Sequence, residues 1–364
     1  MLNVTHGSPA RRRRRLALLI GTATLALAGC SGPGALRSHY AEYSQAQAQA
    51  GNQQTLLNLA RIRNGHPPYF LQLGPFTASY SFTVGSTGSF THLWNPLPGV
   101  SSGSSGALGL SGSATEAPLF NFSPLSGPAF AAVLMTPIAA NSLSSLLLQG
   151  FSATVLLRMF ADEITLTTAA GQKVFLINGL NSEDADNYGD LLRLAEVLQA
   201  LQSSRSLHIE TVTASGITTL RVTTNERSTP VLQRLAAREG ARVQLKSLAN
   251  QTLTSGFSAD IKLRSYVGAL YAMAGDGAIA DSLPVALRDS LPENQRDAIL
   301  RIDAAADLTE PQAASVDYAG RKYVISDRAG SMRYRTSFQA LRFVFAECEL
   351  NPAQVPQSTT LQVR

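Results

Sequence analysis

The first 29 residues have the composition of a segment that is removed before folding, so the fold has to be built from the residues that follow them. Five arginines, Arg11–Arg15, precede an apolar run from Leu16 to Ala28. This run is shorter than the roughly 20 apolar residues that a membrane-spanning helix needs. A basic stretch followed by a short apolar stretch and small residues is typical of a cleaved export signal. We therefore predict a signal peptide over residues 1–29.

The end of this segment, Leu27-Ala28-Gly29-Cys30, resembles the lipobox of bacterial lipoproteins. The resemblance implies cleavage between Gly29 and Cys30 and acylation of the Cys30 sulfur, which would anchor the chain to a membrane. Ser31 stands where an aspartate commonly marks retention in the inner membrane, which implies an outer-membrane location facing the periplasm. An ordinary signal peptide or an uncleaved anchor helix are the alternatives. The pair Arg14-Arg15 leaves the export route open between general secretion and twin-arginine export.

Loss of the signal peptide also removes the excess positive charge. The whole chain has 30 Lys and Arg against 25 Asp and Glu, and the five arginines of residues 1–29 account for the difference. The mature chain is therefore formally neutral. Because a basic surface is the electrostatic signature of nucleic-acid binding, we expect no nucleic-acid partner.

The chain has 2 cysteines, so acylation of Cys30 would leave Cys348 without an intramolecular partner. Cys348 lies in a helical pattern, where a buried cysteine acting as a small hydrophobe is favoured over a reactive thiol. None of the histidines of the mature chain stands at metal-ligand spacing from another histidine or a cysteine. They are His39, His66, His92 and His208. We expect no metal and no cofactor.

Apolar periodicity and turn residues predict an α+β fold with antiparallel β-hairpins packed by helices. The expected helices are 36–63, 126–135, 142–148, 153–165, 181–201, 230–239, 259–274 and 334–347. The expected strands are 69–73, 76–84 and 242–248, with hairpins over 207–223 and 315–326. The expected domains are a lipidated tether at 30–35, one globular body over 36–350 and a disordered tail at 351–364.

Residues 85–115 are dominated by Ser and Gly and contain no charged residue. Such a segment buries too little apolar surface to offset the entropy of ordering it. We predict a long flexible loop here. Pairing of the segments that flank it stays open, because the closure entropy of a loop grows only slowly with its length.

Three segments, residues 56–71, 124–130 and 316–347, resemble a group of Gram-negative envelope lipoproteins that has no established activity. The first of them reads LLNLARIRNGHPPYFL. The resemblance implies an envelope location and one architecture over most of the mature chain, and it brings no catalytic residues. The second strand of the last hairpin, Tyr323-Val324-Ile325, is less aromatic than is usual in the group.

Two patterns suggest chemistry but have simpler explanations. Gly99-Val-Ser101-Ser-Gly103 fits the formula of a nucleophile elbow, which needs a strand before the serine and a helix after it. Here the formula arises within a Ser/Gly-rich stretch, so we do not expect a serine hydrolase. The acidic group of Glu183, Asp184, Asp186 and Asp190 lacks the order of a calcium loop, and helix-start acids explain it better.

Arg61 and Arg63 are the basic residues with the least obvious role. They are candidates for binding a carboxylate, a phosphate or a partner protein. Alternatively, they complement the negative end of their own helix. Two further patterns, Asp276-Gly277 and Asp327-Arg-Ala-Gly330, predict turns.

These features together favour a membrane-anchored binding, scaffold or accessory subunit of a cell-envelope system, with a possible protein partner there. The alternative is an envelope hydrolase that acts on cell wall or lipid. It would need titratable side chains that converge in a cleft.

Overall fold

The computed structural model describes residues 31–73, 77–92, 104–119, 121–180, 185–214, 216–304, 311–327, 332–349 and 359–360. They divide into two compact units, each described separately below. Unit 1 holds the described residues up to Gln47, from Leu73 to Ser123 and at 359–360. Unit 2 holds those of Ala48–Gln72 and of Pro124–Pro356. The predicted α+β class, with antiparallel hairpins packed by helices, is confirmed.

Unit 2 is built on a five-stranded antiparallel sheet in the order β6-β5-β11-β8-β7. Its strands are β5 (Ala161–Thr168), β6 (Lys173–Ile177), β7 (Leu207–Ala214), β8 (Ile217–Thr224) and β11 (Phe257–Leu263). Burial alternates along the central strand, with Phe257, Ala259 and Ile261 buried. This period of two residues places the core on one face of the sheet.

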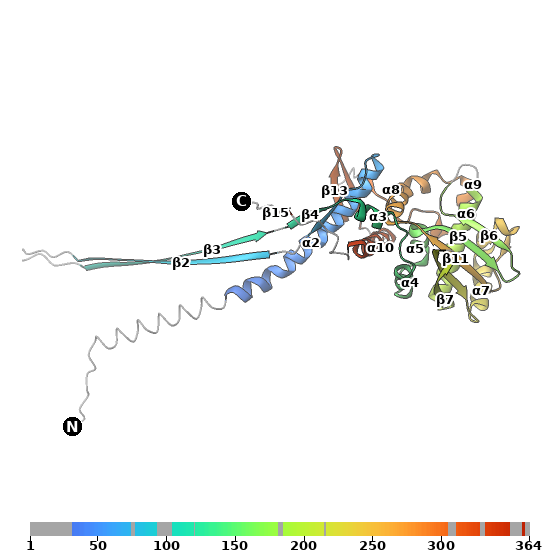
Figure 1. The fold of residues 1–364 in the computed structure, drawn as a ribbon, viewed down its shortest axis with the longest axis horizontal. Helices are drawn as coiled ribbons and strands as arrows, with labels where there is room; N and C mark the ends of the chain where they lie inside the picture. The colour runs from blue at the N-terminus through green and yellow to red at the C-terminus, as the bar shows by residue number, and fades with distance from the viewer. Residues whose placement is uncertain are drawn as a thin grey trace, which may run out of the picture. The chain divides into compact units, whose positions relative to one another are not determined.

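Helix α6 (Ala185–Ser203) packs against this sheet and contacts both edge strands, β6 and β7 (Figure 1). It is buried almost continuously from Tyr188 to Leu198, because α5 (Ala153–Phe160) and α7 (Ser228–Glu239) also pack on it. Short elements complete this region. They are α4 (Ala140–Leu148), η1 (Gly240–Val243), β9 (Gln244–Leu245), η2 (Lys246–Leu248), β10 (Gln251–Thr252), α9 (Val285–Ser290) and η3 (Glu293–Gln295).

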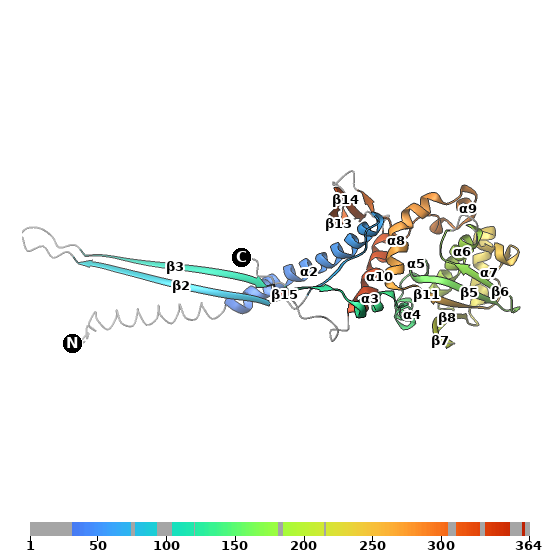
Figure 2. The same ribbon diagram turned by 45° about the horizontal axis from the view of Figure 1, so that its top comes forward.

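The rest of unit 2 gathers around α8 (Tyr266–Ser282) and α10 (Met332–Glu349), which contact each other and α5 (Figure 2). An aromatic cluster joins distant segments here. Phe345 of α10 stacks on Phe70 with ring centroids 5.1 Å apart and lies 5.3 Å from the ring of Tyr266. The remaining elements of the region are β1 (Phe70–Leu73), α3 (Pro128–Met135), β12 (Asp303–Ala304), β13 (Gln312–Tyr318) and β14 (Arg321–Ser326).

Unit 1 contains a long β-hairpin. Strands β2 (Thr77–His92) and β3 (Ser104–Leu119) pair from Thr77↔Leu119 to His92↔Ser104 without a shift of register (Figure 1). Strand β15 (Thr359–Thr360) pairs with β4 (Asn121–Leu125). The remainder of the predicted tail, 351–358 and 361–364, lies outside the described residues.

The hairpin differs from the prediction of a flexible loop over 85–115. Residues 85–92 and 104–115 are paired strand residues, so the pairing that the sequence left open extends through them. Thr87, Ser89 and Thr91 in β2 and Ser111, Ser113 and Thr115 in β3 occupy alternate positions, which is the period of a strand. Residues 93–103 lie outside the described residues.

Other boundaries also differ. Helix α2 (Ser31–Arg63) includes residues 31–35, which the sequence predicts as a tether. Pro33 is compatible with this helix because it stands in the first turn, where a proline costs no backbone hydrogen bond. The predicted helix 153–165 ends at Phe160, where the chain continues into β5. The predicted helix 259–274 is instead β11 followed by α8. In the part of the chain that the structure describes, no helix is both long and apolar enough to span a membrane.

Candidate functional site

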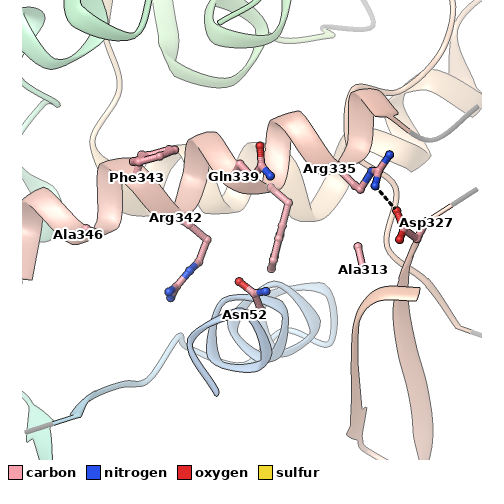
Figure 3. Close-up of a pocket in the computed structure, with 9 residues that line it drawn as sticks. Asn52, Ala313, Asp327, Arg335, Gln339, Arg342, Phe343 and Ala346 are labelled. Atoms are coloured by element: carbon pink, nitrogen blue, oxygen red, sulfur yellow. Dashed lines mark ion pairs between the residues drawn. The ribbon is translucent and has the colours of Figure 1, made fainter. Parts of the chain in front are cut away.

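A pocket lined by described residues of unit 2 runs along α10 and is larger than the two other pockets described below. We call it the α10 groove; its volume is about 680 Å³. It lies between α10, the part of α2 that belongs to unit 2, and the hairpin β13–β14 (Figure 3). Its lining residues are Asn52, Ala313, Asp327, Arg335, Phe338, Gln339, Arg342, Phe343 and Ala346.

One of the two arginines of the groove is neutralised within the fold. Arg335 forms an ion pair with Asp327, with 2.8 Å between Nη1 and Oδ1 (Figure 3). Arg342 extends toward α2 instead, and no ion pair joins it to a carboxylate among the described side chains (Figure 3). Among the described side chains, Arg342 is therefore the one guanidinium of the groove without a carboxylate partner.

A glycine makes room for this charge. A Cβ atom at Gly51 would clash with the guanidinium of Arg342, so a side chain at residue 51 would move the guanidinium from its place against α2. The apolar part of the groove includes Phe338, which is buried, and Phe343, which is 55% exposed. The ring of Phe343 packs edge-on against the ring of Phe151, with 5.7 Å between the ring centroids. An apolar surface beside a single cation suits a partner segment that carries a carboxylate next to an apolar side chain.

A second pocket, of about 330 Å³, is lined by a buried ion pair. Arg158 of α5 and Asp276 of α8 have side chains only 3% and 5% exposed and lie 3.4 Å apart. Asp276 also accepts the backbone N–H groups of Ile299 and Leu300, at 2.6 and 3.0 Å, and Arg158 donates to the carbonyl of Asp297 at 2.9 Å. These bonds tie the chain segment 297–300 to two helices.

The same pocket contains shifted titratable groups. Burial raises the pKa of Tyr188 above its ordinary value, although Arg158 opposes this shift. Burial also lowers the pKa of Arg264, which donates to the carbonyl of Asn178. Such shifts occur at active sites, but structural ion-pair networks produce them too. Since Arg158, Asp276 and Arg264 all have bonds within the fold, we interpret this pocket as a structural polar cluster.

None of these pockets has the composition of a hydrolytic site. The α10 groove contributes Asp327, the cluster contributes Asp276, and a third pocket of about 250 Å³ contributes Glu347. Each is the only Asp, Glu, His or Ser that lines its pocket. Among the described residues, no three His, Cys, Asp or Glu side chains are grouped to hold a metal ion.

The structure places Arg61 and Arg63 at the end of α2, where both bind their own chain. Arg61 Nε donates to the carbonyl of Pro67 at 2.8 Å, and its guanidinium lies 5.7 Å from the ring centre of Tyr318. Arg63 donates to the carbonyl of Ile302. These contacts favour the structural alternative for both arginines over the binding of an anion or a partner.

Two acidic residues have other roles than those the sequence suggested. Asp190 is not a helix-start acid, because it lies fully buried in α6 and accepts the backbone N–H groups of Lys246 and Ser247. Asp276 is not in a turn but inside α8, held by the bonds to residues 299 and 300. Asp186 does lie in the first turn of α6.

The histidines are distributed rather than clustered. His66 Nδ1 lies 2.6 Å from the hydroxyl of Tyr318, and His208 lies 3.9 Å from Glu210. His39 is in α2 and His92 ends β2. Cys348 lies in α10, as the helical pattern predicted. Gly29, Cys30, Ser101, Glu183 and Asp184 lie outside the described residues.

Sequence reasoning missed the residues that form the α10 groove and the polar cluster. A weak signal existed for each. Gly51 interrupts a helix-tolerant Gln/Ala run, and Arg158 is the one charged residue in the apolar helix Ala153–Phe160. A glycine or a charge in such a place often has a packing reason.

Comparisons with protein-family models, with curated proteins and with solved structures found no match.

Proposed function

We propose that this chain is an outer-membrane lipoprotein of the cell envelope, held by acyl chains on Cys30, that acts as a binding or scaffold subunit on the periplasmic side. The observation that carries the proposal is the sequence Leu27-Ala28-Gly29-Cys30 after a basic and an apolar stretch. Each buried methylene contributes about 0.8 kcal/mol, and two or more acyl chains give stable anchoring. The neutral mature chain agrees with a role that does not depend on nucleic acid.

The anchor is tested by labelling cells with palmitate. The wild-type chain should incorporate the label, and Cys30→Ala should abolish incorporation and leave an unprocessed or released chain. Cys348→Ala is the matched control, because it removes the other cysteine and should leave labelling unchanged. Equal labelling of the Cys30→Ala chain would refute the proposal.

The α10 groove supports a binding role. Its uncompensated Arg342 and exposed Phe343 are suited to a partner segment with a carboxylate beside an apolar side chain. Cross-linking in intact cells, followed by purification, should recover one partner in constant ratio. Arg342→Glu and Gly51→Leu should both reduce that recovery, the second because the new side chain displaces Arg342.

Arg321→Glu is the matched control for charge, since Arg321 is exposed on β14 and does not line the groove. It should leave partner recovery unchanged. Equal recovery with Arg342→Glu and with Arg321→Glu would show that the groove is not the binding site. The hydrolase alternative has no observation in its favour in the three pockets described above.

A further inference from the structure

The hairpin β2–β3 is too long and too rich in glycine to be stable alone. Each strand has 16 residues, whereas strands in globular proteins usually have about 3–10, and an isolated two-stranded hairpin is at best marginally stable. In the described part of the chain, β2 and β3 pair only with each other. Both strands therefore have an outer edge whose backbone groups need another partner.

The residue types of the hairpin differ between its two faces. Because successive residues of a strand belong to opposite faces, one face holds the apolar positions of β2 and the positions of β3 in register with them. Its large apolar residues are Tyr80, Phe82, Val84, Phe90, Leu108 and Leu110. The other face holds mainly hydroxyl residues. These are Ser79, Ser81, Thr83, Thr87, Ser89, Thr91, Ser105, Ser111, Ser113 and Thr115.

Charge is almost absent from this part of the sequence. Within β2 and β3 the only Asp, Glu, Lys or Arg is Glu116, although 15% of the whole chain is charged. Glu116 is in register with Tyr80 and therefore shares the apolar face, but it stands at the end of that face, close to where the two strands join the rest of the chain. There a carboxylate belongs to the polar interface of a bilayer and not to its hydrocarbon core. A water-exposed ribbon has no reason to exclude charge, but a ribbon in contact with lipid does.

The length of the apolar face fits a bilayer. From Tyr80 to Phe90 the strand rises about 34 Å at roughly 3.4 Å per residue. A tilt of about 45°, usual for strands in membranes, reduces this rise to about 24 Å along the membrane normal. That is close to the ~25 Å height of the apolar band of membrane-spanning strands. Tyr80, Phe82 and Phe90 place aromatic residues at both ends of the face, where membrane-embedded strands concentrate them.

We propose that the β2–β3 hairpin inserts into a lipid bilayer, with the Tyr80–Phe90 face toward the acyl chains and with its edges paired to the hairpins of further copies of this chain. Copies are required because no water in the hydrocarbon region can satisfy the free backbone N–H and C=O groups of the edges. The outer edge of β3 in one copy can pair with the outer edge of β2 in the next. This pairing continues the antiparallel order and keeps the hydroxyl face of every copy on the same side.

The test uses the lipidated mature chain with Cys348→Ser, in vesicles of phosphatidylethanolamine and phosphatidylglycerol. Single cysteines at positions 81, 82, 83 and 84 are labelled with an environment-sensitive dye. Phe82→Cys and Val84→Cys should report an apolar environment, and Ser81→Cys and Thr83→Cys an aqueous one. The same emission at all four positions would overturn insertion.

Assembly is measured on the same samples by chemical cross-linking and by particle mass. Oligomers should form in vesicles, and dye alternation in a strictly monomeric chain would overturn the pairing of copies. Val84→Asp, at the centre of the apolar face, should reduce the inserted fraction at least tenfold. Thr83→Asp is the matched control on the opposite face and should leave insertion unchanged, while an unchanged circular dichroism spectrum in detergent shows that both variants fold.

This proposal extends the proposed function but does not depend on the lipid anchor. If Cys30 were not acylated, mass spectrometry would show dye on Cys30 as well. Alternation of the dye signal along positions 81–84 would still report insertion of the hairpin. Failure of the anchor and failure of the hairpin therefore give different results.

Discussion

Replacing Asp190 by asparagine should destabilise the fold by about 3–5 kcal/mol, the usual cost of breaking a buried ion pair by removing one partner. Asp190 is 0% exposed and accepts four hydrogen bonds. The donors are Lys246 N at 2.9 Å, Ser247 N at 2.7 Å, Ser247 Oγ at 2.6 Å and Arg193 Nη1 at 2.8 Å. An asparagine would leave the positive charge of Arg193 without a partner. Its side-chain NH2 group would also face N–H and O–H groups that need a hydrogen-bond acceptor.

The measurement is urea unfolding of the mature chain, followed by far-ultraviolet circular dichroism, with a thermal scan beside it. At roughly 2–4 °C per kcal/mol for a domain of this size, the melting temperature should fall by roughly 6–20 °C. Asp186→Asn is the matched control. Asp186 lies one turn earlier in α6 and pairs with the same Lys246 at 2.6 Å, but on the surface, so its loss should cost at most about 1 kcal/mol. Similar effects of the two substitutions would refute the reasoning.

Three further predictions concern the interior of unit 2. Burial raises the pKa of Tyr188, so the unfolded chain ionises at a lower pH than the folded chain. The neutral phenol therefore stabilises the fold fully below about pH 10, and this contribution is lost as the pH rises through the folded-state pKa. Between about pH 8 and about pH 11, urea unfolding should show a steeper loss of stability for the wild type than for Tyr188→Phe, and equal slopes would contradict the prediction. Gly189→Ala places a Cβ 2.5 Å from Leu287 Cδ1 and should destabilise the fold by about 1–3 kcal/mol in urea unfolding. Gly275→Ala, which has open space around it in α8, should instead stabilise the fold by about 0.5–1 kcal/mol. Effects of the same sign would contradict the steric argument for Gly189. Asn178 Nδ2 donates to the carbonyls of residues 157, 158 and 161, so Asn178→Ala should cost about 1–3 kcal/mol in the same assay, and a neutral result would show that these carbonyls find other donors.

The two hairpins of unit 2 were predictable because their signals are local. The turn at residues 215–216 and the turn at Ala319-Gly320 each separate two alternating apolar runs, and the structure has β7–β8 and β13–β14 there. Ala319 and Gly320 both have positive φ, of 50° and 73°, as such two-residue turns require. Helix α6, before β7–β8, and helix α10, after β13–β14, likewise follow from apolar periodicity.

The central strand of the sheet was not predictable in the same way. Residues 257–263 alternate in burial, yet the apolar run that follows them led us to expect a helix over 259–274. What fixes β11 is its pairing with β5 and β8 on both sides, over sequence separations that no local pattern reports. The end of α5 has a similar cause. Asn178 donates to the carbonyls of Leu157 and Arg158 near the end of that helix and to the carbonyl of Ala161 in β5, 17 to 21 residues away.

The two buried carboxylates Asp190 and Asp276 share one role, which is neither the helix-start nor the turn position that their sequence patterns predict. Asp190 binds the backbone N–H groups of residues 246–247, and Asp276 binds those of residues 299–300, so each fixes a segment far along the chain to a core helix. With 2 cysteines in the chain, one of them the expected acylation site, disulfides are not available for this task. A buried carboxylate gives up its hydration for such bonds, and an arginine beside each one, Arg193 or Arg158, offsets that loss. It follows that removing either carboxylate should release its distant segment first, while the sheet and its apolar core persist.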